Sequence, residues 1–191
     1  GACYKGQSDV FKNYMRRSVD IEMLDGWGRT ALHHACNGGH LKIVKKLVEK
    51  MSNIDLSDNE GHTPLFEACA NMRSDIINFL LQTGRVDPYK KFTIGIFWMG
   101  NMDSDFDGSP KTLPILMLKY KKPRVVCIFI KNKCIDIDEK ILKGKTLFEI
   151  ACIKGYYEIA DSLIANNTVD VNKQFLRPLD VPIPAVRCAH E

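Results

Sequence analysis

The stretch that decides the fold is residues 25–48, DGWGRTALHHACNGGHLKIVKKLV, because its layout recurs at residues 58–81, DNEGHTPLFEACANMRSDIINFLL. Each copy holds a polar turn with glycine, a short segment containing Ala-Cys, and a second segment with apolar residues at i, i+1, i+4 and i+5. Apolar residues at these spacings lie on one face of an α-helix. Because the two copies are 33 residues apart, the sequence predicts a short helix pair that repeats along the chain.

The apolar pairs of the second helix extend this register to five units. The third step between pairs is longer than the others, which places an insertion between the third and fourth units. The pairs are Val10-Phe11, Ile43-Val44, Ile76-Ile77, Val125-Val126 and Ile159-Ala160, at steps of 33, 33, 49 and 34 residues. The register predicts helix pairs near residues 30–50, 63–82, 112–132 and 146–166, with a partial pair near 2–17.

Local capping signals mark where the helices begin and turn. A threonine precedes each predicted first helix, and its hydroxyl can accept a hydrogen bond from the first free amides of that helix. A glycine, suited to the left-handed residue after a helix, separates the helices of the second and fifth units. In the fourth unit Pro114, Met117 and Lys121 replace the expected leucine, alanine and glycine, so its first helix should be shorter or displaced. The threonines are Thr30, Thr63, Thr112 and Thr146, and the glycines are Gly39 and Gly155.

Residues 25–91 closely resemble the ankyrin repeat, through the pattern D-x-x-G-x-T-P-L-H-x-A followed by Gly-His and an I-V-x-x-L-L helix. The resemblance implies an all-α solenoid of helix–loop–helix units with projecting hairpin loops, about four and a half repeats long. It implies a repeat domain over 1–174, with repeats at 2–24 (partial), 25–57, 58–91, 107–140 and 141–174, an insertion at 92–106, and an irregular tail at 175–191. Because the first unit lacks its opening turn, the natural chain is expected to extend further upstream.

Composition and cysteine content limit the classes of partner and the cellular compartment that the sequence predicts. The 191 residues carry 27 basic and 23 acidic side chains, and a net charge of +4 is too small to indicate nucleic-acid binding by itself. The best apolar run, residues 125–130, is far shorter than the roughly 18 residues of a membrane span, so no membrane partner is expected. The seven cysteines form no CxxC pair, which predicts free thiols and a reducing intracellular compartment, cytoplasmic or nuclear. We expect Cys36, Cys69 and Cys152 to be buried and Cys188 to be accessible.

No catalytic residue, metal site or cofactor is expected. The chain contains no nucleophile-elbow, phosphate-loop, dinucleotide-binding or zinc-protease motif. Residues 103–108, DSDFDG, match the first half of a calcium loop, but Pro114 stands where that loop needs a bidentate glutamate. Adjacent His33 and His34 point about 100° apart on a helix and cannot chelate one ion well. The resemblance implies instead that His33 ties neighbouring loops together by hydrogen bonds.

The resemblance also implies that partner-binding residues lie at the hairpin tips and on the exposed side of each first helix. Basic residues outnumber acidic ones among the positions assigned to this face, which indicates either a solvated face with charges clustered by chance or a groove for a partner protein with an acidic surface or segment. A polyanion, either a nucleic acid or a phosphorylated ligand, is the alternative, with nucleic acid the less favoured. The apolar insertion has two interpretations, because its Trp98 either packs over the fourth unit or anchors a partner. The predicted partner-binding residues are Trp27, Arg29, His62, Trp98, Lys111, Lys119, Tyr120, Lys143, Lys145 and Lys154.

Overall fold

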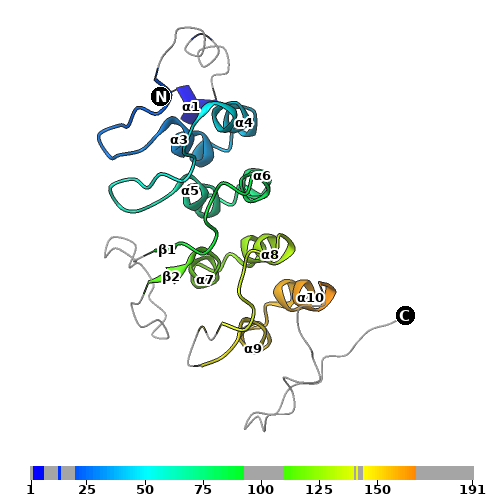
Figure 1. Ribbon diagram of the computed structural model, residues 1–191. Coiled ribbons are helices and arrows are strands. Elements are labelled where there is room, and N and C mark those ends of the chain that lie inside the picture. The colour runs from blue at the N-terminus through cyan, green and yellow to red at the C-terminus, as the bar shows by residue number, and fades with distance from the viewer. Residues whose placement is uncertain are drawn as a thin grey trace.

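The computed structural model describes residues 2–6, 13, 20–92, 110–139, 141 and 144–166. In this part of the chain a short helix, α1 (Ala2–Lys5), is followed by helix pairs that stack in chain order (Figure 1). The first helices of the pairs form one layer, the second helices form another, and loops project beside the first layer (Figure 1). The pairs are α3 (Ala31–Gly38) with α4 (Leu41–Lys50), α5 (Pro64–Ala70) with α6 (Ser74–Gln82), α7 (Leu113–Lys119) with α8 (Pro123–Lys131), and α9 (Leu147–Lys154) with α10 (Tyr157–Ala165).

The stacked helix pairs confirm the predicted solenoid and the helix pairs predicted near residues 30–50, 63–82, 112–132 and 146–166. Of the partial pair predicted near 2–17, α1 is described, and most of the remainder lies outside the described residues. Threonines cap the first helices as expected, and the hydroxyls of Thr30, Thr63 and Thr146 accept backbone hydrogen bonds at 3.4, 3.2 and 3.4 Å. Thr112 occupies the same position before α7 without such a bond. Each of these hydroxyls therefore pairs with one of the backbone N–H groups that a helix leaves without a partner at its start.

The prediction that the fourth unit has a shortened or displaced first helix is wrong. Helix α7 has seven residues, as α5 does, and it begins directly after its threonine. Pro114 falls in the first turn, where a missing N–H breaks no intrahelical bond. Met117 is fully buried in place of alanine, and Lys121 adopts a φ of 55°, the left-handed conformation that Gly39 adopts with a φ of 84°. The unit therefore keeps its shape at the cost of backbone strain at a non-glycine residue.

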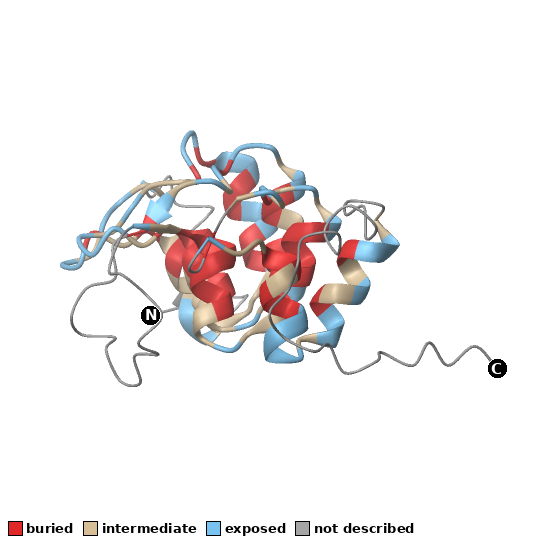
Figure 2. Cartoon of the chain, turned by 90° about the horizontal axis from the view of Figure 1, so that it is seen from below, coloured by how far each residue is buried: buried red, intermediate tan, exposed pale blue. Residues whose placement is uncertain are grey.

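The hydrophobic core lies between the two helix layers (Figure 2). It includes residues of every described helix pair. The apolar stripe predicted for the second helices lies in it, and Val44, Leu47, Ile76, Ile77 and Leu80 have no exposed surface. Burying a side chain of this size stabilises a fold by about 1.5–3 kcal/mol. No unit can bury its stripe alone, so stability depends on contacts between neighbouring units.

A second set of contacts between units uses basic side chains that precede the second helices. Each donates to a carbonyl at the C-terminal end of the preceding unit's first helix, where helical carbonyls lack partners. These bonds join His40 to Tyr4, Arg73 to Asn37, and Lys122 to Ala70. The repeat pattern includes the histidine at position 40, but the sequence analysis predicted none of these three contacts.

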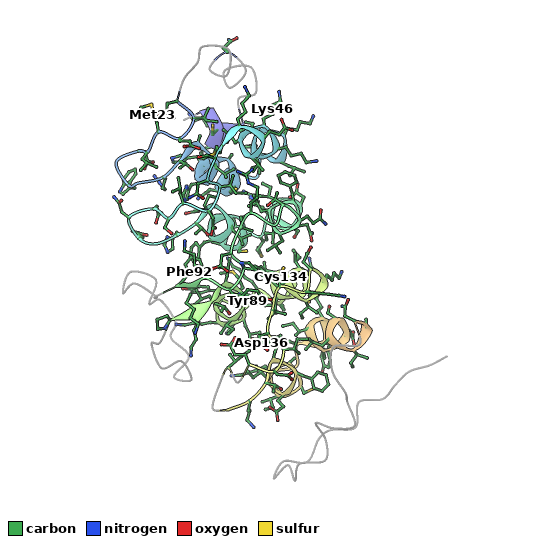
Figure 3. The ribbon with its side chains drawn as sticks, viewed as in Figure 1. Met23, Lys46, Tyr89, Phe92, Cys134 and Asp136 are labelled. Atoms are coloured by element: carbon green, nitrogen blue, oxygen red, sulfur yellow. The ribbon has the colours of Figure 1, made fainter. Side chains whose placement is uncertain are left out.

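A short antiparallel ribbon flanks the insertion. Strand β1 (Lys91–Phe92) pairs with β2 (Lys111–Thr112), which brings the two ends of the segment 93–110 side by side. Phe92, labelled in Figure 3, is buried, and its ring centroid lies 5.3 Å from that of Phe66. The first residue of the predicted insertion is therefore part of the core. The rest of the insertion, including Trp98, lies outside the described residues.

The cysteines differ from prediction at one position. Cys36 and Cys69 are buried as expected, and burial raises the pKa of both thiols far above its usual range, which makes them poor nucleophiles. The prediction of a buried Cys152 is wrong, because Cys152 is exposed and its neighbour Ala151 is buried. Helix α3, which carries Cys36, and helix α5, which carries Cys69, each pack against the first helix of the next unit. Cys152 belongs to the unit of α9 and α10, and no further helix follows α10 in the described part of the chain. Cys188 lies outside that part.

Candidate functional site

One carboxylate, Asp25, organises the hairpin of the second unit. Its Oδ1 accepts hydrogen bonds from the backbone N–H groups of Trp27 and Arg29, both at 2.9 Å. Its Oδ2 accepts from Arg29 Nε at 3.2 Å and lies 2.9 Å from His34 Nε2. Burial opposes ionisation of Asp25, but these hydrogen bonds and the Arg29 charge outweigh it and hold the pKa of the carboxyl well below its usual range. The ionised carboxylate therefore holds the hairpin closed.

This hairpin presents Trp27 to solvent. The indole is 66% exposed, and the guanidinium carbon of Arg29 lies 4.6 Å from the ring centroid, a cation–π contact. Met23 and Leu24, on the same loop, are also exposed, and Met23 lies on the opposite side of the helix layers from Lys46 (Figure 3). A large aromatic side chain that is exposed but held by its neighbours loses little freedom when a partner covers it.

The hairpins of the second and third units are bonded to each other. The backbone N–H of Asn59 donates to the carbonyl of Trp27 at 3.0 Å, and Asn59 Nδ2 donates to the carbonyl of Gly26 at 3.4 Å. Gly28 permits this approach, since it has a φ of 75° and a Cβ there would lie 2.5 Å from Asn59 Oδ1. The two hairpins therefore form one continuous ledge beside the first helices.

His33 has the role that the resemblance implied, which is to tie adjacent loops. The backbone N–H of Thr30 donates to His33 Nδ1 at 3.0 Å, so that nitrogen is the acceptor. The protonated Nε2 then donates to the carbonyl of His62 in the next unit at 3.1 Å. Burial lowers the pKa of His33, which favours the neutral ring that this arrangement requires.

The third unit gathers acidic groups around His62. The imidazole Nδ1 lies 3.4 Å from Glu60 Oε2 and 3.9 Å from Asp58 Oδ2, and its ring stacks on Phe66 with centroids 4.0 Å apart. Glu67, on α5, lies close enough that Asp58, His62 and Glu67 each bring one ligand atom within 4.8 Å of the others. The sequence analysis assigned His62 to the partner face but gave no role to Asp58 or Glu67. The available signal was their spacing, which repeats that of Asp25, Arg29 and His34 in the unit before.

The remaining predicted partner-binding residues lie in the fourth and fifth units or outside the described part. Lys111, Lys119, Tyr120 and Lys145 are half-buried, and Lys154 is exposed at the end of α9. Trp98 and Lys143 are not among the described residues. Among the described residues, the hairpins and first helices of the second and third units also carry acidic side chains: Asp25, Asp58, Glu60 and Glu67. The face is therefore mixed in charge toward the N-terminal end and not basic along its whole length.

A family model matches the N-terminal part of the chain. The model described as ankyrin repeats in three copies matches residues 1–91, which include both hairpins of the ledge and the helices behind them. None of the curated proteins compared with the chain matches it. Among the described residues, every helix is too short or too polar to cross a membrane.

Proposed function

Because residues 1–91 belong to the ankyrin-repeat family, we propose that this chain is a protein-interaction module that binds a partner protein on its hairpins and first helices. Ankyrin repeats generally mediate contacts between proteins and have no catalytic role. The observation that carries the proposal is the Trp27 hairpin, in which Asp25 and Arg29 hold a largely exposed indole at the edge of the ledge.

The contribution of Trp27 to the binding free energy can be estimated from its exposure and its contacts. Tryptophan is enriched among the few residues that dominate binding energy, and truncating such an anchor costs about 2 kcal/mol or more. That cost corresponds to roughly a 30-fold rise in Kd. A fixed indole also avoids part of the ordering cost that binding imposes on a free side chain.

The partner's chemistry is the finer part of the proposal. The predicted basic residues of the fourth and fifth units support a partner with an acidic segment that crosses this end of the face. A less charged part of the partner would then cover Trp27 at the N-terminal end of the face, where acidic side chains lie. Charged residues at the rim of an interface, such as Lys145 and Lys154, raise the association rate more than they raise the affinity. The unpaired thiols of the described cysteines are consistent with an encounter inside the cell.

The experiment compares three intact chains as bait: the wild type, Trp27→Ala, and the control Tyr157→Ala. Tyr157 is 74% exposed on α10, so its truncation removes an exposed aromatic ring far from the hairpin ledge. Proteins retained by the wild type and by Tyr157→Ala are identified by mass spectrometry, and their affinities are measured with purified components. We expect at least a 30-fold loss with Trp27→Ala and less than a 3-fold change with Tyr157→Ala. Equal losses for both variants would rule out the ledge as the binding surface.

A salt titration of the same complex separates a protein partner from a polyanion. Binding to a nucleic acid or polyphosphate releases counterions and gives a steep linear fall of log K with log salt, by about 0.7–0.9 per phosphate contact. For a protein anchored by Trp27 we expect a shallow dependence, carried by the rim lysines. A steep slope together with an unchanged affinity of Trp27→Ala would refute the proposed partner class.

A further inference from the structure

Three side chains of the kinds that bind metal ions lie together at the base of the hairpin of the third unit, called the third hairpin below. Asp58 opens the hairpin, His62 closes it, and Glu67 lies one helical turn into α5. One ligand atom from each lies within 4.8 Å of the other two. In a tetrahedral zinc site with bonds of about 2.0–2.2 Å, ligand atoms lie about 3.4 Å apart, so closure needs shifts of about 1 Å. Small adjustments of the three side chains, with their present contacts kept, supply such shifts.

Each of the three groups is held in place by a contact that leaves a ligand atom available. Asp58 Oδ1 accepts from the backbone N–H groups of Glu60 at 2.9 Å and His62 at 2.8 Å, and this directs Oδ2 toward the imidazole. The His62 ring is fixed by its stack on Phe66. Glu67 Oε2 accepts a 2.7 Å hydrogen bond from Asn37 Nδ2 of the preceding unit. Outer contacts of this kind orient metal ligands in known sites.

The second unit shows what the same scaffold does with other residues. There Asp25 also accepts two backbone N–H groups through Oδ1, and its Oδ2 is met by Arg29 at 3.2 Å and His34 at 2.9 Å. The third unit has a histidine in place of that arginine and a glutamate in place of that histidine. The same aspartate oxygen loses both close donors.

In the third unit an imidazole lies near the aspartate Oδ2, at a longer distance than the donors of the second unit. The side chain of Asp58 is only 5% exposed, and the ion-pair partner of its Oδ2 is His62 Nδ1 at 3.9 Å, too far for a hydrogen bond. Within the described residues, the ion pairs of Asp58 and Glu60 both involve this one imidazole. A cation between Asp58 and Glu67 would compensate two carboxylates whose oxygens lie within 4.8 Å of each other.

We propose that Asp58, His62 and Glu67 bind a zinc ion at the base of the third hairpin, with water completing the coordination. One imidazole nitrogen and two carboxylate oxygens match the ligand preference of Zn²⁺. Ca²⁺ and Mg²⁺ prefer six or more oxygen ligands, which this set does not supply. The ion would replace the charge compensation that Arg29 and His34 give Asp25, and it would lie on the ledge where the proposed partner binds.

The test is calorimetric titration of the intact, reduced, metal-free chain with ZnCl₂, for the wild type, His62→Gln and Glu67→Gln. We expect one zinc per chain for the wild type and at least about a tenfold weaker affinity for each variant, because each loses one of three protein ligands. MgCl₂ and CaCl₂ should give no saturable binding. His34→Gln is the matched control, since it makes the same substitution beside the equivalent aspartate and should bind zinc as the wild type does. Thermal melts without metal establish that every variant is folded.

Cobalt distinguishes this site from binding by cysteines. With Co²⁺ in place of zinc we expect only weak visible bands, as nitrogen and oxygen ligands produce, and no near-ultraviolet charge-transfer band from thiolate. A thiolate band, wild-type zinc affinity in both His62→Gln and Glu67→Gln, or no saturable zinc binding by the wild type would each overturn the proposal. The Trp27→Ala chain should bind zinc normally, so failure of the partner proposal and failure of this one are separate results.

Discussion

Arg85 offers a sharp test of how neighbouring units stabilise each other. It follows α6, yet its guanidinium donates to the carbonyls of Val48 at 2.8 Å, Met51 at 2.6 Å and Ser52 at 3.0 Å, at the C-terminal end of α4 in the preceding unit. These carbonyls have no intrahelical partner, and a positive charge is favourable at that end of a helix. A single side chain therefore caps a helix of another unit.

The expected cost of Arg85→Met follows from these three bonds. The two partly buried bonds contribute about 1 kcal/mol each, and the exposed third contributes little because water replaces it. The predicted loss is about 2 kcal/mol, which for a chain of this size lowers Tm by roughly 4–8 °C. Arg85→Lys should fall between the wild type and Arg85→Met, because one ammonium group cannot serve all three carbonyls.

Thermal and urea denaturation followed by circular dichroism measure this loss. Lys46→Met is the matched control, because it removes a cation from the exposed surface of the same helix α4 and should change stability by less than about 0.5 kcal/mol. If Arg85→Met melts within about 1 °C of the wild type, the capping role assigned to the guanidinium is wrong.

Three further predictions concern the glycine where the two hairpins meet, the buried histidine and the thiols. Gly28→Ala should lower Tm by several degrees, because Gly28 has a left-handed φ and its Cβ would meet the next hairpin; an unchanged Tm would show that the ledge can open without cost. Because burial lowers the pKa of His33, the unfolded chain binds a proton near pH 6.5 while the folded chain does not. The free energy of unfolding should thus fall as pH drops below about 6.5, by at most about 1.4 kcal/mol per pH unit, and His33→Gln should show a smaller pH dependence in urea titrations at pH 5.5 to 7.5. In native thiol labelling followed by mass spectrometry, Cys152 should react well before Cys36 and Cys69, and equal rates would contradict the burial described for α3 and α5.

The fold was accessible from sequence because its signals are local. The apolar stripes such as Ile43-Val44 and Leu47-Val48 depend only on helical periodicity, and the threonine caps depend only on the next turn of the chain. Repetition at a fixed step then implies stacking, since one helix pair cannot bury its own stripe. The partner face at the hairpins and first helices, with Trp27 and Arg29, was implied by the resemblance to the ankyrin repeat and stays a prediction.

The contacts between units depended on the tertiary structure, because they join residues about 30 or more positions apart whose distance is set only when the units stack. The sequence analysis assigned no role to Arg73 or Arg85, and in the stack both cap helices of the preceding unit. Lys121 looked like a disruption, yet the packed unit holds it in the conformation of a glycine. The sequence by itself determined the repeating helices and their buried faces. Only the tertiary structure brought the Glu67 carboxylate to the base of the third hairpin, because that distance depends on how the hairpin folds back against its helix.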